Sequence, residues 1–169
     1  MLIKNHNKII IIGDAGRGKT TLAEKLFQKL DIKHYSTDDF YYKKKFSEVR
    51  VREESIELIS KVYHNDKWIV EGSTQWLLQP GLDSADLIIY LKYINIFPQW
   101  LVLIKRHFTR GDKNIWHTIL LLRHVLYKRY GWGHKRGKIT HKEVVAPYLN
   151  KTIVLSSFKE INNFINKIN

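Results

Sequence analysis

The feature that most constrains the fold is a glycine-rich octapeptide between an apolar run and an amphipathic segment. Residues 13–20 read Gly-Asp-Ala-Gly-Arg-Gly-Lys-Thr and match the pattern G-x-x-x-x-G-K-[ST]. The preceding run, Lys8–Gly13, is continuous and β-branched, which is typical of a buried parallel strand. From Gly18 onward the apolar residues recur at helical spacing. Strand, loop and helix in this order predict a P-loop that binds the phosphates of a nucleoside triphosphate.

The residue types of the loop suit phosphate binding. The glycines let backbone N–H groups surround a phosphate, while Lys19 reaches the β- and γ-phosphates and the Thr20 hydroxyl coordinates Mg²⁺. The alternative is an ordinary glycine turn, which does not account for the strand before it and the helix after it. We therefore expect ATP and Mg²⁺ as ligands. The predicted nucleotide contacts in this region are Gly13, Asp14, Ala15, Gly16, Arg17, Gly18, Lys19, Thr20 and Thr21.

Strand and helix patterns alternate along the rest of the chain, whose length of 169 residues suits one domain. This alternation predicts an α/β fold of three layers, with a parallel sheet between helices. The further predicted strands are residues 34–37, 68–70, 87–91 and 152–155, and the further predicted helices are residues 53–63, 97–108, 114–130 and 158–168.

Carboxylates stand at the ends of two predicted strands. Ligands of open parallel sheets bind at the carboxyl ends of the strands, so these residues are expected beside the P-loop. Asp38, preferred over Asp39, would accept a proton from an attacking hydroxyl or hold a magnesium-bound water. Glu71 would contact the magnesium shell. The alternatives are a helix N-cap or turn for the aspartates and a solvated strand end for Glu71.

The net charge of +13 is concentrated in one region. Residues 92–142 contain twelve lysines and arginines and one acid, Asp112, so they carry eleven of the thirteen net charges. Arg106, Arg110 and Lys113 are spaced to share a helix face, where they would stabilise a phosphoryl group in transfer or form a solvated basic face. The whole basic region would also suit nucleic acid as a partner.

Other classes of protein and site are less well supported. Cysteine is absent, which excludes disulfides and thiolate chemistry and fits a reducing cytoplasm. No apolar run is long enough to span a membrane, and no signal peptide is visible, so a cytoplasmic protein without a membrane partner is expected. The histidines show no zinc-binding spacing. Arg52 is a further candidate for binding an acceptor, and Trp132 for stacking on a base, with a surface position and core packing as their alternatives.

Five sequence blocks together resemble the adenylate-kinase-like P-loop proteins. They are IIIIGDAGRGKTTLAEKL (9–26), YSTDDF (35–40), WIVEG (68–72), ADLIIYL (85–91) and TIVLSSF (152–158). The group that they resemble most is the DNA topology modulation proteins. The resemblance implies a five-stranded parallel sheet in the order 2-3-1-4-5, with an acceptor-binding segment at about 38–63 and a basic lid at about 97–142. It also implies an adenine-contacting loop at residues 156–159, which includes Ser157.

One departure bears on the acceptor. Adenylate kinases carry an arginine shortly after the third strand, whereas Glu71-Gly72 is followed here by Ser73-Thr74-Gln75-Trp76. The leading hypothesis is an ATP-dependent kinase that acts on a nucleoside, nucleotide or similar small molecule. In it, Lys19, Asp38, Arg106 and Arg110 would be catalytic, and Thr20, Asp38 and Glu71 would bind the metal. The alternative is a nucleotide-dependent protein that binds nucleic acid with little or no turnover. A motor-type ATPase and a GTPase lack the expected Asp-Glu pair and N-K-x-D motif.

Overall fold

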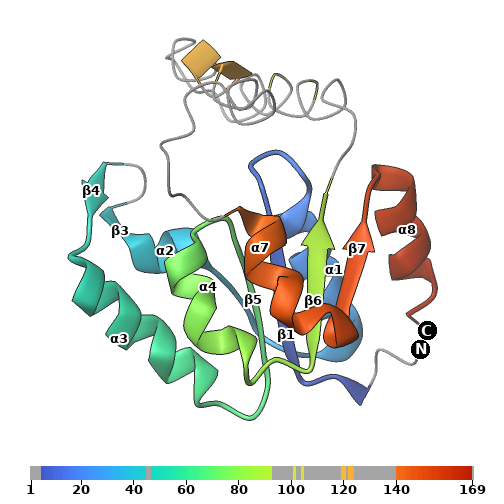
Figure 1. Cartoon of the computed structure of the whole chain (residues 1–169), viewed down its shortest axis with the longest axis horizontal. Coiled ribbons are helices and arrows are strands. Elements are labelled where there is room, and N and C mark those ends of the chain that lie inside the picture. Colours follow the sequence, from blue (N-terminus) through green and yellow to red (C-terminus); the bar gives the residue numbers. More distant parts are fainter. Residues whose placement is uncertain are drawn as a thin grey trace.

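A five-stranded sheet with helices on both faces forms the body of the protein (Figure 1). The computed structural model describes residues 5–44, 47–92 and 140–168, together with residues 101, 104, 119, 120, 122 and 123. The strands of the sheet are β1 (Lys8–Gly13), β2 (His34–Ser36), β5 (Trp68–Gly72), β6 (Leu87–Leu91) and β7 (Thr152–Leu155). They pair in parallel in the order β2-β5-β1-β6-β7. This confirms the predicted order 2-3-1-4-5 and the α/β class.

β1 lies at the centre of the sheet, and its apolar run explains why. The side chains of Ile9, Ile10, Ile11 and Ile12 are all fully buried, as expected for a strand covered on both faces. The register pairs Ile12 with Gly72 of β5 and Gly13 with Leu91 of β6. The three strands therefore end at the same level. In Figure 1 the arrows of β6 and β7 point toward the loop that follows β1.

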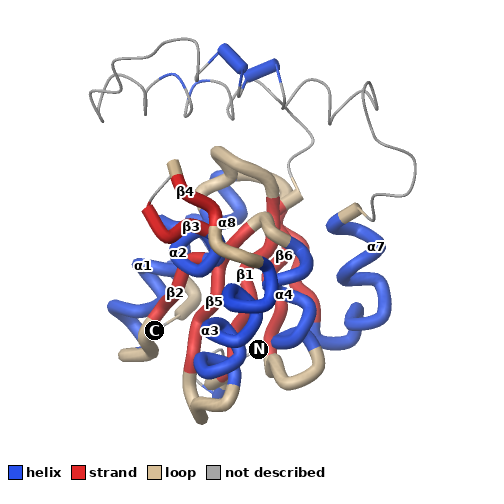
Figure 2. The backbone as a smooth tube through the Cα atoms, turned by 90° about the vertical axis from the view of Figure 1, so that its left-hand side faces the viewer, coloured by secondary structure: helices blue, strands red, loops and turns tan. Residues whose placement is uncertain are grey.

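The alternating side chains of the strands divide the core into two layers. Ile9 and Ile11 pack with helices α1 (Lys19–Leu30) and α8 (Phe158–Asn166). Ile10 and Ile12 belong to the opposite layer, which is covered by α3 (Arg52–Tyr63), α4 (Gln75–Leu82) and α7 (His141–Val145). Figure 2 shows the sheet from the side, with helices around it. The three-layer arrangement predicted from the sequence is therefore confirmed.

Several short elements were not predicted. Helix α2 (Thr37–Tyr41) follows β2 directly, and a hairpin of β3 (Tyr42–Lys44) and β4 (Glu48–Val49) follows α2. Helix α4 contains Pro80, and a 3₁₀ helix, η2 (Ala146–Lys151), joins α7 to β7. Most of these elements are too short to show a periodic apolar pattern. The predicted helices at 97–108 and 114–130 fall almost entirely outside the described residues.

Within the described residues, no helix combines the length and the apolar character needed to cross a membrane.

Candidate functional site

The loop between β1 and α1 has the backbone that a phosphate cradle needs. Gly16 and Gly18 adopt φ angles of 74° and 80°, in the left-handed region that other residues rarely occupy. Gly18 is also the N-cap of α1, and it has no side chain that could accept hydrogen bonds from the free N–H groups of the first helical turn. These groups and the positive end of the helix dipole therefore remain available to an anion. The geometry agrees with the P-loop that the sequence predicts.

Lys19 begins α1 and turns back over the loop. Its Nζ donates a hydrogen bond to the backbone oxygen of Asp14 at 3.0 Å. Burial lowers the pKa of the Lys19 ammonium from its ordinary value, and the nearby negative charges of Glu71 and Asp38 act in the opposite direction. Both predicted carboxylates are therefore close enough to influence the lysine electrostatically.

Thr20 and Glu71 are brought together from different elements. The Thr20 hydroxyl, in the first turn of α1, donates to Glu71 Oε1 at 2.9 Å. Glu71 is only 3% exposed, because β5 is an inner strand of the sheet. The alternative of a solvated strand end is therefore wrong. A hydroxyl and a carboxylate are hard oxygen donors of the type that Mg²⁺ prefers. Thr21, the next residue of α1, is exposed.

Asp38 lies in the first turn of α2, where Ser36 is the helix cap. The backbone N–H of Asp38 donates to Ser36 Oγ at 3.4 Å, so neither aspartate is itself the N-cap. Asp39 is exposed, whereas Asp38 is partly buried. Burial raises the pKa of the Tyr42 hydroxyl, and the charge of Asp38 adds to that shift. The charge of Asp38 therefore acts on both Lys19 and Tyr42, which favours it over Asp39.

Gly72 lets α2 approach the end of β5. A Cβ atom at Gly72 would collide with Thr37, which is fully buried at the start of α2. This close contact between Thr37 and the strand holds α2 against the residue that follows Glu71. The position of Asp38 relative to Glu71 thus depends on a glycine.

Aromatic residues cluster around α2, the helix that contains Asp38. The ring centroids of Tyr41 and Trp76 are 6.1 Å apart, and those of Tyr41 and Tyr42 are 4.7 Å apart at an edge-on angle. The guanidinium of Arg52 lies 5.2 Å from the centre of the Trp76 ring. Arg52 was a candidate for acceptor binding in the sequence, and Trp76 is a partly buried residue that also packs against the core. We call Asp38, Tyr41, Tyr42, Arg52 and Trp76 the acceptor-side group.

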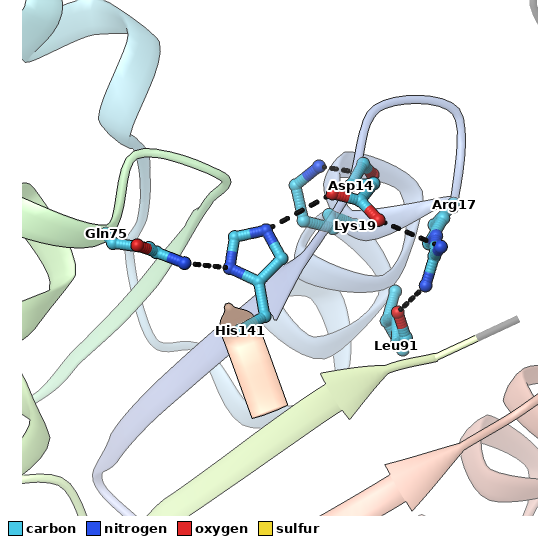
Figure 3. Close-up of polar contacts among 6 residues, drawn as sticks. All are labelled: Asp14, Arg17, Lys19, Gln75, Leu91 and His141. Atoms are coloured by element: carbon cyan, nitrogen blue, oxygen red, sulfur yellow. Dashed lines mark hydrogen bonds and ion pairs between the residues drawn. The ribbon is translucent and has the colours of Figure 1, made fainter. Parts of the chain in front are cut away.

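Asp14 and Arg17, two variable positions of the P-loop, form a polar cluster with a distant helix (Figure 3). Arg17 Nη2 lies 2.9 Å from Asp14 Oδ2, and Arg17 Nη1 donates to the backbone oxygen of Leu91 at 2.8 Å. His141 Nε2 lies 3.3 Å from Asp14 Oδ1, and Gln75 Nε2 lies 3.2 Å from His141 Nδ1.

Sequence reasoning missed both His141 and Gln75. His141 was excluded as a metal ligand, and no other function was considered for it. One signal was available, because Thr140 and Glu143 form a capping box that starts a helix at His141. That signal locates the helix but not its contact with Asp14, which depends on tertiary packing.

The predicted adenine loop lies beside the P-loop. Ser157 is the N-cap of α8, and its hydroxyl accepts from the Glu160 N–H at 3.2 Å. A Cβ atom at Gly18 would lie 3.3 Å from the Phe158 ring, so the start of α8 packs against the loop. Ser157 thus has a structural function as a cap, and its contact with a nucleotide stays a prediction.

The remaining predicted residues lie outside the described part of the chain. They are Arg106, Arg110, Lys113 and Trp132. Within the described part, no group of three or more His, Asp or Glu side chains is arranged to hold a metal ion. Any Mg²⁺ at Thr20 and Glu71 would therefore take its other ligands from phosphates and water, as Mg²⁺ usually does.

Comparison with known sequences gives one partial match. No family model matches the sequence. Over 84 residues, the chain is 36% identical to a protein of Bacillus subtilis (strain 168) described as "Uncharacterized protein YqaC". The match covers 49% of this chain and 47% of that protein, so the chain spans about half the length of the curated relative that it matches.

Solved structures of small-molecule kinases are similar over almost the whole chain. Shikimate kinase from Acinetobacter baumannii, in complex with shikimate, gives a TM-score of 0.58 at 16% identity, covering 98% of this chain and 92% of that one. Shikimate kinase from Bacteroides thetaiotaomicron gives 0.56 at 14% identity, covering 96% of each chain. These comparisons do not test the resemblance to the DNA topology modulation proteins, which stays a prediction. The chain has the α/β fold of P-loop kinases.

Proposed function

We propose that this chain is an ATP-dependent phosphotransferase that moves the γ-phosphoryl group of ATP to a small-molecule acceptor, such as a nucleoside or nucleotide. The observation that carries the proposal is the meeting of three elements at one edge of the sheet. The P-loop supplies Lys19 and Thr20, β5 supplies Glu71, and α2 supplies Asp38. A carboxylate near the lysine in addition to the Thr20–Glu71 pair supports transfer to an acceptor over nucleotide binding alone.

The donor side would bind the triphosphate through backbone N–H groups and Lys19. Thr20 and Glu71 would hold Mg²⁺, and the metal would neutralise charge on the phosphates. The absence of an N-K-x-D motif and the adenine loop implied by the family resemblance favour ATP over GTP. Ser157 would contribute to that loop.

The acceptor side would use Asp38 as a base. An acceptor oxygen would form a bond to the γ-phosphorus while the bond from that phosphorus to the β–γ bridging oxygen breaks, releasing ADP. Asp38 would take the proton if the attacking group is a hydroxyl. Arg106 and Arg110 would stabilise the charge of the transferring group.

The acceptor-side group limits what can bind there. Arg52 offers a positive charge next to the ring of Trp76, and Tyr41 and Tyr42 add to the aromatic surface beside that ring. An acceptor that combines a ring with a hydroxyl fits this surface, because rings pack on aromatic side chains. Shikimate, bound by one of the structures that share the fold, has both features, as nucleosides do.

Transfer of labelled phosphate tests the proposal. The protein would be incubated with γ-labelled ATP, Mg²⁺ and a panel of nucleosides, nucleotides and hydroxylated ring acids. We expect label to appear on one class of acceptor with the unmodified protein and to be lost with Asp38→Asn. ATP hydrolysis that no acceptor stimulates and that Asp38→Asn leaves unchanged would contradict a phosphotransferase.

The nucleic-acid alternative depends on residues 92–142, most of which lie outside the described part. Counterion release gives it a clear signature: engagement of about five cations predicts a slope of roughly −3.5 to −4.5 for log affinity against log salt. Charge reversal at Lys135 and Arg136 would flatten that slope. Absence of binding to DNA and RNA at low salt would leave the phosphotransferase proposal alone.

A further inference from the structure

Asp14 is an unexpected residue in a loop that binds phosphate. It carries a negative charge on the second position of the P-loop, where the loop must receive a polyanion. Arg17 lies 2.9 Å from one carboxylate oxygen and compensates that charge. Such compensation is needed because like charges repel strongly in a partly buried site. The other carboxylate oxygen faces His141.

Asp14 also determines where the P-loop lysine lies. Its backbone oxygen accepts the hydrogen bond from Lys19 Nζ at 3.0 Å. A change in the position of the Asp14 peptide therefore moves the point to which the lysine is attached. Lys19 is the side chain expected to reach the β- and γ-phosphates. An interaction that positions Asp14 therefore also affects the contact between Lys19 and the phosphates.

His141 is well placed to hold Asp14. It is 9% exposed and stands at the start of α7, which the Thr140–Glu143 capping box fixes. The next turn of α7 inserts Val144 and Val145 into the core. The imidazole Nε2 is buried and, although 3.3 Å from Asp14 Oδ1, has no well-aligned hydrogen bond. A capped helix that packs against the core thus presents a buried ring nitrogen to the loop.

Gln75 fixes the other side of the ring. Its amide lies 3.2 Å from His141 Nδ1, and it is the first residue of α4, next to Trp76 of the acceptor-side group. If Nδ1 accepts from the amide, Nε2 carries the proton and can donate to Asp14. The series Gln75, His141, Asp14 and Lys19 therefore connects the acceptor side to the P-loop (Figure 3).

We propose that His141 is a positioning residue for the nucleotide: through Asp14 it holds the P-loop and Lys19 in the conformation that binds the triphosphate. This inference rests on the proposed binding of ATP at the P-loop. It assigns a function to a histidine far from the motif in sequence. Gln75 would in turn orient the imidazole.

A matched pair of substitutions tests the inference. His141→Gln and His141→Met have side chains of similar length, but only glutamine can donate a hydrogen bond to Asp14. We expect His141→Met to weaken Mg²⁺-ATP binding by about tenfold, because methionine cannot replace the polar contact of the imidazole with the Asp14 carboxylate. His141→Gln should stay within about threefold of the unmodified protein. Calorimetric titration of the full chain measures both.

A double-mutant cycle shows whether the effect passes through Asp14. In an Asp14→Ala background, His141→Met should change ATP affinity by less than about twofold, because the partner is gone. An undiminished tenfold loss there would overturn the inference. So would a folded His141→Met variant with unchanged ATP affinity and a lowered melting temperature, since His141 would then be purely structural.

If the unmodified protein binds no ATP, the proposed function fails and this inference fails with it. If it binds ATP and both variants bind equally, only the inference fails.

Discussion

The donor side and the acceptor side of the candidate site are built in different ways. Eight consecutive residues form the P-loop, and their chemistry depends on backbone amides and one lysine. The acceptor-side group is assembled from α2, β3, α3 and α4, and its aromatic and arginine side chains meet through aromatic and cation–π contacts. The first is encoded locally and the second only by tertiary packing. A motif therefore reveals what the chain binds as donor, but not its acceptor.

Asp38→Asn should separate the two sides most sharply. Loss of a general base typically lowers turnover by about 10²- to 10⁴-fold. ATP affinity should change little, because Asp38 lies on α2 and not on the P-loop. Steady-state kinetics and calorimetry measure the two quantities. Equal losses in both would make Asp38 part of the donor site.

Glu71→Gln should weaken the binding of Mg²⁺. The amide oxygen can still accept from Thr20, so the fold should persist, but the charge that attracts Mg²⁺ is lost. We expect the Mg²⁺ concentration for half-maximal activity to rise by about 10- to 100-fold. Glu57→Gln, which changes an exposed glutamate of α3 paired with Lys61, serves as the control. An unchanged Mg²⁺ requirement would remove Glu71 from the metal site.

Gly72→Ala should disturb the contact between β5, which carries Glu71, and α2, which carries Asp38. The added methyl group would collide with Thr37, and overpacking of this kind costs about 1–3 kcal/mol. The free energy of unfolding should fall by that amount, and turnover should fall further as α2 moves. Denaturant titration measures the first effect, with Ser73→Ala as the neighbouring control. Full stability in the variant would show that α2 does not depend on this glycine.

Trp76→Leu should affect the acceptor side alone. Aromatic pairs contribute about 0.5–1.5 kcal/mol beyond buried area, so the KM for the acceptor should rise by about two- to tenfold. The KM for ATP should not change. Phe27→Leu, at an exposed aromatic residue of α1, is the control. A rise in the KM for ATP instead would place Trp76 near the donor.

The sequence predicted the parts of the fold that have strong local patterns. Ile9 to Ile12 identified the central strand, and the glycines identified the loop, because their chemistry leaves few alternatives. Asp38 and Glu71 were predicted to lie beside the P-loop from the rule that ligands of open parallel sheets bind at the carboxyl ends of the strands. Their proximity to Lys19 agrees with that rule.

The parts that were missed depend on contacts between distant segments. Gln75 lies 66 residues from His141 in sequence, and nothing in either neighbourhood indicates that the two side chains meet. Helix α4 was not predicted, and it contains Pro80 and Gly81, residue types that are typical of turns. In the fold, Gly81 instead packs directly against the ring of Tyr63, where a larger residue would collide. Packing here overrides the local signal.

Binding of Mg²⁺-ATP to the unmodified protein and to Lys19→Ala tests the central claim most directly. Lys19 is the P-loop side chain expected to meet the phosphates, and its one described hydrogen bond is to a backbone oxygen within the same loop. Calorimetry should therefore show saturable binding to the unmodified protein and no detectable binding to a folded Lys19→Ala variant. Equal ATP affinity in the two proteins would contradict a P-loop phosphotransferase.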